Sequence, residues 1–157
     1  MTDHKGNIEK DLELLNLAKK TVEKANETLK KYPITKEIQI VVVEPHKRPY
    51  KKMIKNELKA MNEIIEGYTE KVTIDSFDGL KIGLVLNEEG LIYNLPLNRR
   101  IVGFANPIVG TFFISAWNYQ DQFVSLSDDL AENYIKRFTP LEVYLWVIKS
   151  CQIKRVI

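Results

Sequence analysis

The chain has 157 residues and a formal net charge of +2, with 45% hydrophobic and 28% charged residues. Its length fits one compact domain with an appendage, and its composition is typical of a soluble globular protein rather than a disordered one. The single cysteine, Cys151, excludes an intramolecular disulfide and a zinc site built on several thiolates, while a net charge this small does not by itself indicate nucleic-acid binding.

The first predicted element is an amphipathic helix over residues 8–32. Apolar side chains recur there at steps of three and four, and Pro33 ends the pattern. Four of them, Ile8, Leu15, Val22 and Leu29, fall seven residues apart, which is also the spacing of a coiled coil. We favour a face that packs on its own domain, and the alternative is a homodimer through residues 8–32. We therefore expect residues 1–36 to form a helical extension and residues 37–157 to form the main domain.

A strand and a helix are predicted next, joined by a basic loop. Residues 38–43 are nearly continuous in β-branched side chains, as in a central strand that is covered on both faces. Residues 50–66 show the apolar spacing of a helix, with Pro49 suited to its first position. This interpretation places Lys51 and Lys52 in the first turn of that helix.

Several shorter elements complete the predicted order. The sequence predicts strands over residues 69–75, 80–86, 91–93, 108–117 and 123–126, an irregular segment over 96–107, a helix over 128–138 and a last helix after Thr139. Asp78-Gly79 supplies a turn, Gly110 a bulge, and Ser127 a helix cap. This mixture predicts an α+β domain with a single mostly antiparallel sheet, packed helices and an N-terminal amphipathic helix. The first strand could still run parallel to a neighbour.

A family resemblance covers about residues 38–138. Its segments include Glu44-Pro45 with Lys47, Pro49 and Tyr50, then residues 67–68, 87–90, 95–99, 110–114 and 123–126. In order and spacing they resemble the uncharacterised domain-of-unknown-function family numbered 3846, found in bacteria, phages and conjugative elements. His46 stands where that family usually has glycine. The resemblance implies no particular activity, but its occurrence in mobile elements implies an association with the conflict between such elements and their hosts.

Catalytic and metal-binding motifs are absent from the sequence. His4 and His46 lie far apart, and no serine elbow, phosphate-binding loop or dinucleotide fingerprint occurs. We therefore expect a non-enzymatic protein with no metal and no cofactor. Carboxylates near predicted strand ends leave one enzymatic alternative open, a cryptic metal-dependent nuclease that would use two or three of Glu44, Asp75, Asp78, Glu88 and Glu89.

Two basic segments are the candidate binding sites. Residues 45–59 carry six basic side chains and one acidic side chain, and unpaired N–H groups at a helix start would add to their positive potential. A second segment lies where binding residues often occur, between strands. The candidate residues are Lys47, Arg48, Tyr50, Lys51 and Lys52 in the first segment and Asn98, Arg99 and Arg100 in the second. The alternative is a solvated patch with lysines paired to Glu44 or Glu57, and structural roles for Asn98 and Arg99.

Two aromatic side chains are candidate partner anchors. Trp117 and Tyr119 follow the strand after Gly110, and an exposed aromatic side chain there would suit a protein partner or a base. We favour a core position for Trp117 and leave Tyr119 open.

These observations lead to a functional hypothesis. We expect a cytoplasmic accessory protein of a phage or mobile element that binds a host defence component and occludes its nucleic-acid or nucleotide site. One alternative is a module that binds nucleic acid or nucleotide directly, and another is the nuclease. No membrane partner is expected, because no stretch reaches the roughly 20 apolar residues of a membrane span.

Overall fold

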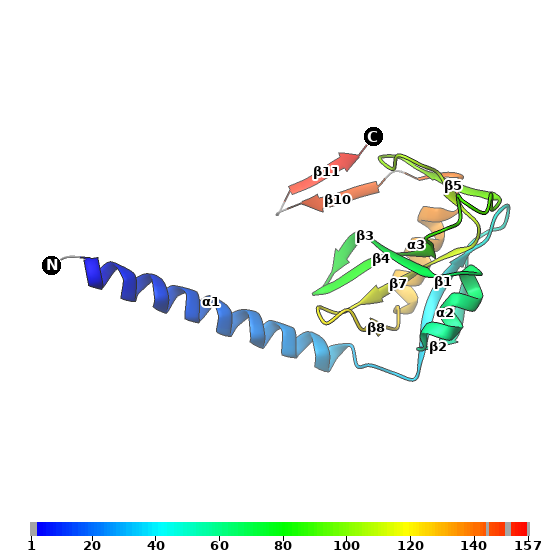
Figure 1. Ribbon diagram of the computed structural model, residues 1–157. Coiled ribbons are helices and arrows are strands. Elements are labelled where there is room, and N and C mark those ends of the chain that lie inside the picture. The colour runs from blue at the N-terminus through cyan, green and yellow to red at the C-terminus, as the bar shows by residue number, and fades with distance from the viewer. Residues whose placement is uncertain (1–2, 144, 150–151, 157) are drawn as a thin grey trace.

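The computed structural model describes residues 3–143, 145–149 and 152–156, and Cys151 lies outside them. Figure 1 shows a layered α+β body from which one long helix extends. The elements are α1 (Asp3–Lys31), β1 (Glu37–Val43), β2 (Tyr50–Lys55), α2 (Leu58–Ile65), β3 (Thr69–Phe77), β4 (Leu80–Asn87), β5 (Leu97–Ile101), β6 (Ile108–Val109), β7 (Phe112–Trp117), β8 (Phe123–Val124), α3 (Asp128–Phe138), β9 (Glu142–Val143), β10 (Leu145–Lys149) and β11 (Gln152–Val156).

The main sheet is antiparallel throughout and has the strand order β2-β1-β7-β4-β3, with β8 paired to β7. This confirms the predicted α+β class and mostly antiparallel pairing. Two smaller sheets accompany it, β6-β5-β9 and the hairpin β10-β11, and the parallel pair β5–β9 belongs to the first of them. The suggestion that the first strand could run parallel to a neighbour is wrong, because β1 is antiparallel to both β2 and β7.

Apolar clusters cover both faces of the main sheet. Val41 and Val43 of β1 point into a cluster that α3 completes with Ala131 and Phe138, among others. The alternate residues of the same strand, Ile38, Ile40 and Val42, point into a second cluster that α2 completes with Met61 and Ile65. The prediction that this strand is covered on both faces is therefore confirmed. Its sequence is apolar without alternation because the side chains on both faces are buried.

The predicted helix over residues 50–66 is wrong in its first half. Residues 50–55 form strand β2, which pairs with β1 from Val42 opposite Tyr50 to Glu37 opposite Lys55. The helix α2 begins only at Leu58. A buried strand needs hydrogen-bonding partners along its edges, and β2 supplies them to β1 on the side away from β7.

Three other sequence predictions need correction. Residues 91–93 form a turn rather than a strand, with Leu91, Ile92 and Tyr93 exposed. Residues 97–101, expected to be irregular, form β5. The segment after Thr139 forms β9, β10 and β11 in the part that the structure describes, not a helix. The helix over residues 128–138 is confirmed, and the Leu130 backbone N–H donates to the Ser127 cap at 3.3 Å.

The N-terminal helix is present but does not pack its face on the domain. Only its C-terminal end makes contact, where Lys31 pairs with Asp78 and the Tyr32 hydroxyl donates to the same carboxylate at 2.7 Å. The rest of α1 extends away from the sheets in Figure 1. Our favoured interpretation of intramolecular packing is therefore wrong for most of the helix.

Candidate binding surface on the β1–β2 hairpin

The basic segment forms the turn of a hairpin. Strands β1 and β2 are joined by residues 44–49, and the Lys47 backbone N–H donates to the Glu44 carbonyl at 3.3 Å. His46 has φ of 60°, in the left-handed region that favours glycine. The family resemblance implies a glycine at this position, and a glycine would adopt such a φ without strain. Lys47 and Arg48 are exposed in this turn.

Two buried side chains of β5 fix the hairpin by hydrogen bonds to its backbone carbonyls. Asn98, only 3% exposed, donates from Nδ2 to the Val43 carbonyl at 2.8 Å and to the Gly110 carbonyl at 2.7 Å. The Arg99 side chain, 2% exposed, donates from Nη2 to the Lys47 carbonyl at 3.1 Å and from Nε to the Phe138 carbonyl at 2.8 Å. The two segments that the sequence singled out do therefore meet.

Asn98 and Arg99 meet the basic turn as supports and not as surface groups, which corrects their expected role in ligand binding and matches the alternative of structural roles. Arg99 also donates from Nη1 to the Asn98 carbonyl and side-chain oxygens, so all its hydrogen-bond acceptors are neutral. Burial lowers the pKa of the Arg99 guanidinium. Arg100 is exposed, and because side chains alternate along a strand it points away from the side on which Arg99 contacts the turn.

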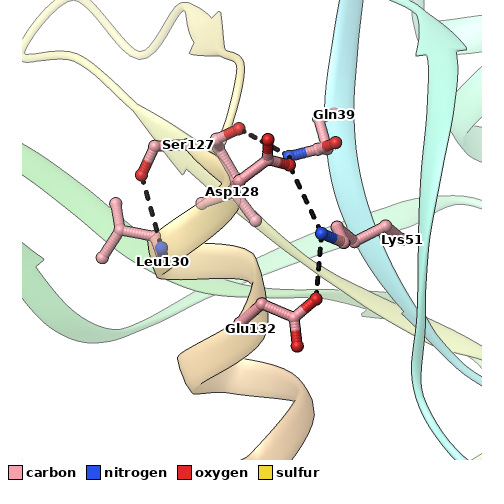
Figure 2. A network of polar contacts seen from close by, with 7 residues as sticks. Gln39, Lys51, Ser127, Asp128, Leu130 and Glu132 are labelled. Carbon is pink, nitrogen blue, oxygen red and sulfur yellow. Dashed lines mark hydrogen bonds and ion pairs between the residues drawn. The ribbon is translucent and has the colours of Figure 1, made fainter.

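The alternation of β2 separates the two lysines that we expected in one helical turn. Lys51 points toward α3, where its Nζ lies 2.9 Å from Glu132 Oε1 and 3.4 Å from Asp128 Oδ1. Gln39 Nε2 donates to the same Asp128 oxygen at 3.1 Å, and Figure 2 shows these groups together at the N-terminal end of α3. The ion pairs match the alternative in which part of the basic patch is neutralised, with Glu44 as the partner of Lys47, as expected, and with acids on α3 as the partners of Lys51.

The pKa values of this network reflect its ion pairs. Hydrogen bonds from Gln39 and Lys51 lower the pKa of Asp128, and Lys51 lowers that of Glu132. The hydrogen bond to Glu132 raises the pKa of Lys51. All three groups are therefore charged at neutral pH.

Lys52 faces the opposite side of the sheet and lines a cleft between the hairpin and α2. The cleft measures about 420 Å³, and its lining carries both signs of charge. Its polar residues are Glu44, Tyr50, Lys52, Lys55, Glu63, Glu66 and Thr111. Partial burial, followed by the effect of Glu44, raises the pKa of Tyr50. Sequence reasoning did not find Glu63 or Thr111 as neighbours of Lys52, because both come from other elements and neither belongs to a charged cluster.

The cations of the hairpin differ in how far they are neutralised. Lys47 Nζ lies 3.2 Å from Glu44 Oε1, and Lys51 has two acidic neighbours. Among the residues that the structure describes, Arg48, Lys52 and Arg100 have no carboxylate within 4.0 Å. The cations that remain for an anion are Arg48 in the turn, which is close enough to Glu132 of α3 to lower its pKa, and Lys52 on the side of α2.

The two aromatic candidates have different positions. Trp117 is 2% exposed and packs edge-to-face on Phe123 with ring centroids 5.9 Å apart, so it belongs to the core as we favoured and offers no surface to a partner. Tyr119 is 49% exposed and stays available as an anchor.

The carboxylates of the nuclease alternative do not gather. Asp75 accepts hydrogen bonds from Tyr134 and Arg137, Asp78 binds the end of α1, and Glu44 lies in the hairpin turn. In the described part of the chain, no three His, Cys, Asp or Glu side chains are placed to hold a metal ion. None of the helices described there is both long and apolar enough to cross a membrane.

Fold and site together define an α+β protein with an antiparallel sheet and a braced basic hairpin at one edge. The chain belongs to the family described as Domain of unknown function (DUF3846), whose model matches residues 38–139. No curated protein and no solved structure matches the chain. The matched range includes the hairpin, the cleft and the Asn98–Arg99 support, and it excludes α1.

Proposed function

We propose that this protein works by binding a phosphate-bearing polymer, single-stranded or double-stranded nucleic acid, through the turn of the β1–β2 hairpin. The observation that carries the proposal is the Arg99 bond to the Lys47 carbonyl, which ties the exposed basic turn to the core. A turn held in one conformation loses less entropy on binding than a mobile one. The proposed contacts come from Arg48 and Lys52, with Lys47 at the margin.

Electrostatics favour contact with the nucleic acid itself. A protein site that binds nucleic acid is itself positive, and a basic hairpin brought against it would meet like charge. The buried Arg99 adds positive charge beneath the turn without a carboxylate among its hydrogen-bond partners. A phosphate at the turn would offset that charge.

The role in a mobile element follows from this binding. We propose that the protein blocks a host defence component by covering the nucleic acid or nucleotide that the component uses, without making or breaking a bond. Support for this part is the resemblance to the family, which implies an occurrence in phages and conjugative elements. The expected result is that the purified protein protects labelled DNA or RNA from a nuclease in proportion to its occupancy.

The test is a binding titration with labelled single-stranded DNA, single-stranded RNA and double-stranded DNA of one length. Fluorescence anisotropy at several salt concentrations should give an affinity that falls with salt, with a log–log slope of about −1.4 on single strands for two phosphate contacts. The double variant Arg48→Glu with Lys52→Glu should lose roughly tenfold or more of the affinity at low salt.

The matched control changes the net charge equally at exposed lysines away from the turn. Lys36→Glu with Lys81→Glu should bind within about twofold of the unmodified protein, because phosphate contacts are local. Circular dichroism should show that both double variants keep the fold. Absence of binding to all three probes at low salt, or an equal loss in the control variant, overturns the proposal.

A further inference from the structure

The helix α1 carries large apolar side chains that the described part of the chain leaves exposed. Ile8, Leu12, Leu14, Leu15, Leu17 and Val22 are each between 53% and 63% exposed. At 100° per residue all of these except Leu17 fall on one side of the helix, together with Ala18 and Ala25. Leu17 lies on the opposite side. A continuous apolar stripe of this length on a projecting helix is typical of an association surface.

The distribution of charge along α1 indicates which partner and which orientation suit this stripe. Residues 8–17 carry three acidic side chains and one basic, whereas residues 18–31 carry five basic side chains and two acidic. A second copy of the same helix in antiparallel orientation places each acidic half beside a basic half. A parallel copy places like charges side by side along the whole length. The helix therefore contains the charge complement of its own reversed copy.

The sizes of the stripe residues favour the same arrangement. In an antiparallel pair centred near Lys20, Leu15 faces Ala25 of the second copy, and Val22 faces Ala18. Large side chains then oppose small ones, which lets the helices approach closely and fill the space between them. Two charged residues, Asp11 and Lys19, lie within the stripe. Asp11 would lie along the lysine-rich half of the other helix, and Lys19 would lie near the middle of the pair.

The attachment of α1 to the domain leaves room for this pairing. Contacts with the domain are confined to the helix end, where Tyr32 binds Asp78 and Thr28 lies against Gly79. Figure 1 shows the N-terminal end of α1 far from the sheets. In an antiparallel pair, the two domains therefore lie at opposite ends of the helices.

We propose that two copies of this chain associate through the apolar stripe of α1 as an antiparallel helical pair. The dimer carries one basic hairpin at each end, separated by the length of the paired helices. Both hairpins remain accessible, because neither is part of the association surface. This inference does not depend on the proposed ligand of the hairpin.

Sedimentation velocity on the full chain tests the association. The unmodified protein should form a dimer whose population rises with concentration. The variant Leu15→Glu with Val22→Glu should be a monomer over the same range. Leu17→Glu is the matched control, because this leucine is at least as exposed but lies off the stripe, so the variant should remain dimeric. A monomeric unmodified chain, or a dimer that resists the stripe variant or is lost in the control, overturns the proposal.

A distance measurement between spin labels tests the orientation. A label at Lys10→Cys in a Cys151→Ser background gives one site per chain, since Cys151 is the only native cysteine. At 1.5 Å rise per residue, an antiparallel pair centred near residue 20 separates the two labels by about 30 Å along the axis. A parallel pair in register would hold them within about 20 Å, given helix axes 8–10 Å apart. The longer distance supports the proposal, and the shorter one overturns it.

Discussion

Arg99 is almost fully buried, yet its guanidinium contacts only neutral oxygens. Its hydrogen bonds join three segments that are far apart in sequence, β5 through Asn98, the end of α3 through Phe138 and the hairpin turn through Lys47. Such an arrangement costs desolvation of a charge, which the hydrogen bonds offset. The position of the basic turn therefore depends on a side chain that no ligand touches.

The first prediction concerns this support. Replacement of Arg99 by Met leaves the Phe138 and Lys47 carbonyls without their donors, and we expect the free energy of unfolding to fall by about 2 kcal/mol. Urea denaturation measures the change as a shift of midpoint with an unaltered slope. Amide hydrogen exchange at residues 45–49 should become faster at the same time.

The control for this prediction is the adjacent residue. Arg100→Met removes an equal charge from the same strand at an exposed site, and its effect should remain within about 0.5 kcal/mol. Equal losses in the two variants would show that Arg99 has no special role in holding the turn.

The sequence left Asn98, Arg99 and Arg100 as candidate binding residues, with structural roles for Asn98 and Arg99 as the alternative, and did not decide between the two. All three are polar side chains in a short segment flanked by prolines at 96 and 107, and a strand of five residues there has no apolar alternation to reveal its inner face. Which of them is buried depends on where α3 ends and where β6 pairs. Those contacts come from distant parts of the chain, and local propensity does not contain them.

At the scale of elements, the main error of sequence reasoning was the helix predicted over residues 50–66. The apolar spacing of Met61, Ile64 and Ile65 does belong to a helix, and it extends by chance into the preceding strand. Within that strand Tyr50, Lys52 and Ile54 share one face, but the lysine between the two apolar residues leaves no alternation that would predict a strand. Tertiary pairing with β1 decided the structure of this segment.

The elements that were predicted correctly have strong local signals. The strand β1 has a continuous run of β-branched residues, and α3 has the Ser127 cap with acids in its first turn. The last segment was wrong because Thr139 and Glu142 resemble a capping box, while the β-branched residues after them favour strands. Competing local signals, rather than weak ones, produced that error.

The second prediction concerns the attachment of α1. Lys31 and then Tyr32 lower the pKa of Asp78. A carboxyl group whose pKa is lowered in the folded state adds stability above its ordinary value of 3.8. That stability is lost as the pH falls through the lowered value. We expect the end of α1 to be fixed at neutral pH and released in acid.

An acid titration followed by NMR measures this release. Amide signals of residues 28–32 should move toward random-coil positions as Asp78 takes up a proton. In Asp78→Asn the same amide signals should already be displaced at neutral pH. They should show no transition in acid, because the variant lacks the carboxyl group. Glu70→Gln, at an exposed site on β3, should keep the transition of the unmodified protein. A transition that survives in Asp78→Asn would assign it to another group.

At the scale of the whole molecule, one sheet separates two apolar clusters, and β1 contributes to both. Helices α2 and α3 cover opposite faces, so the sheet is shielded above and below. Its outer edge at β2 is not shielded in the same way. In the described part of the chain β2 pairs with β1 on one side and with no strand on the other. Lys51, Lys52 and Lys55 are exposed along that edge.

The third prediction follows from this edge. Replacement of Lys51, Lys52 and Lys55 by Thr keeps β-propensity but removes the charge, and we expect the triple variant to form insoluble aggregates on mild heating. Turbidity and sedimentation measure the insoluble fraction. The matched variant with Arg at all three positions should remain in solution, because it keeps the charge. Equal solubility of the Thr and Arg variants would contradict the expectation.

The lysines of β2 thus have a consequence for the cell that is separate from any ligand. A free strand edge is a template onto which another polypeptide can add its own strand, and repetition of that step builds a fibril. Repulsion between the ammonium groups of neighbouring molecules opposes the first addition. A chain produced in quantity is then protected from self-templated precipitation by the same residues that first drew attention as a binding surface.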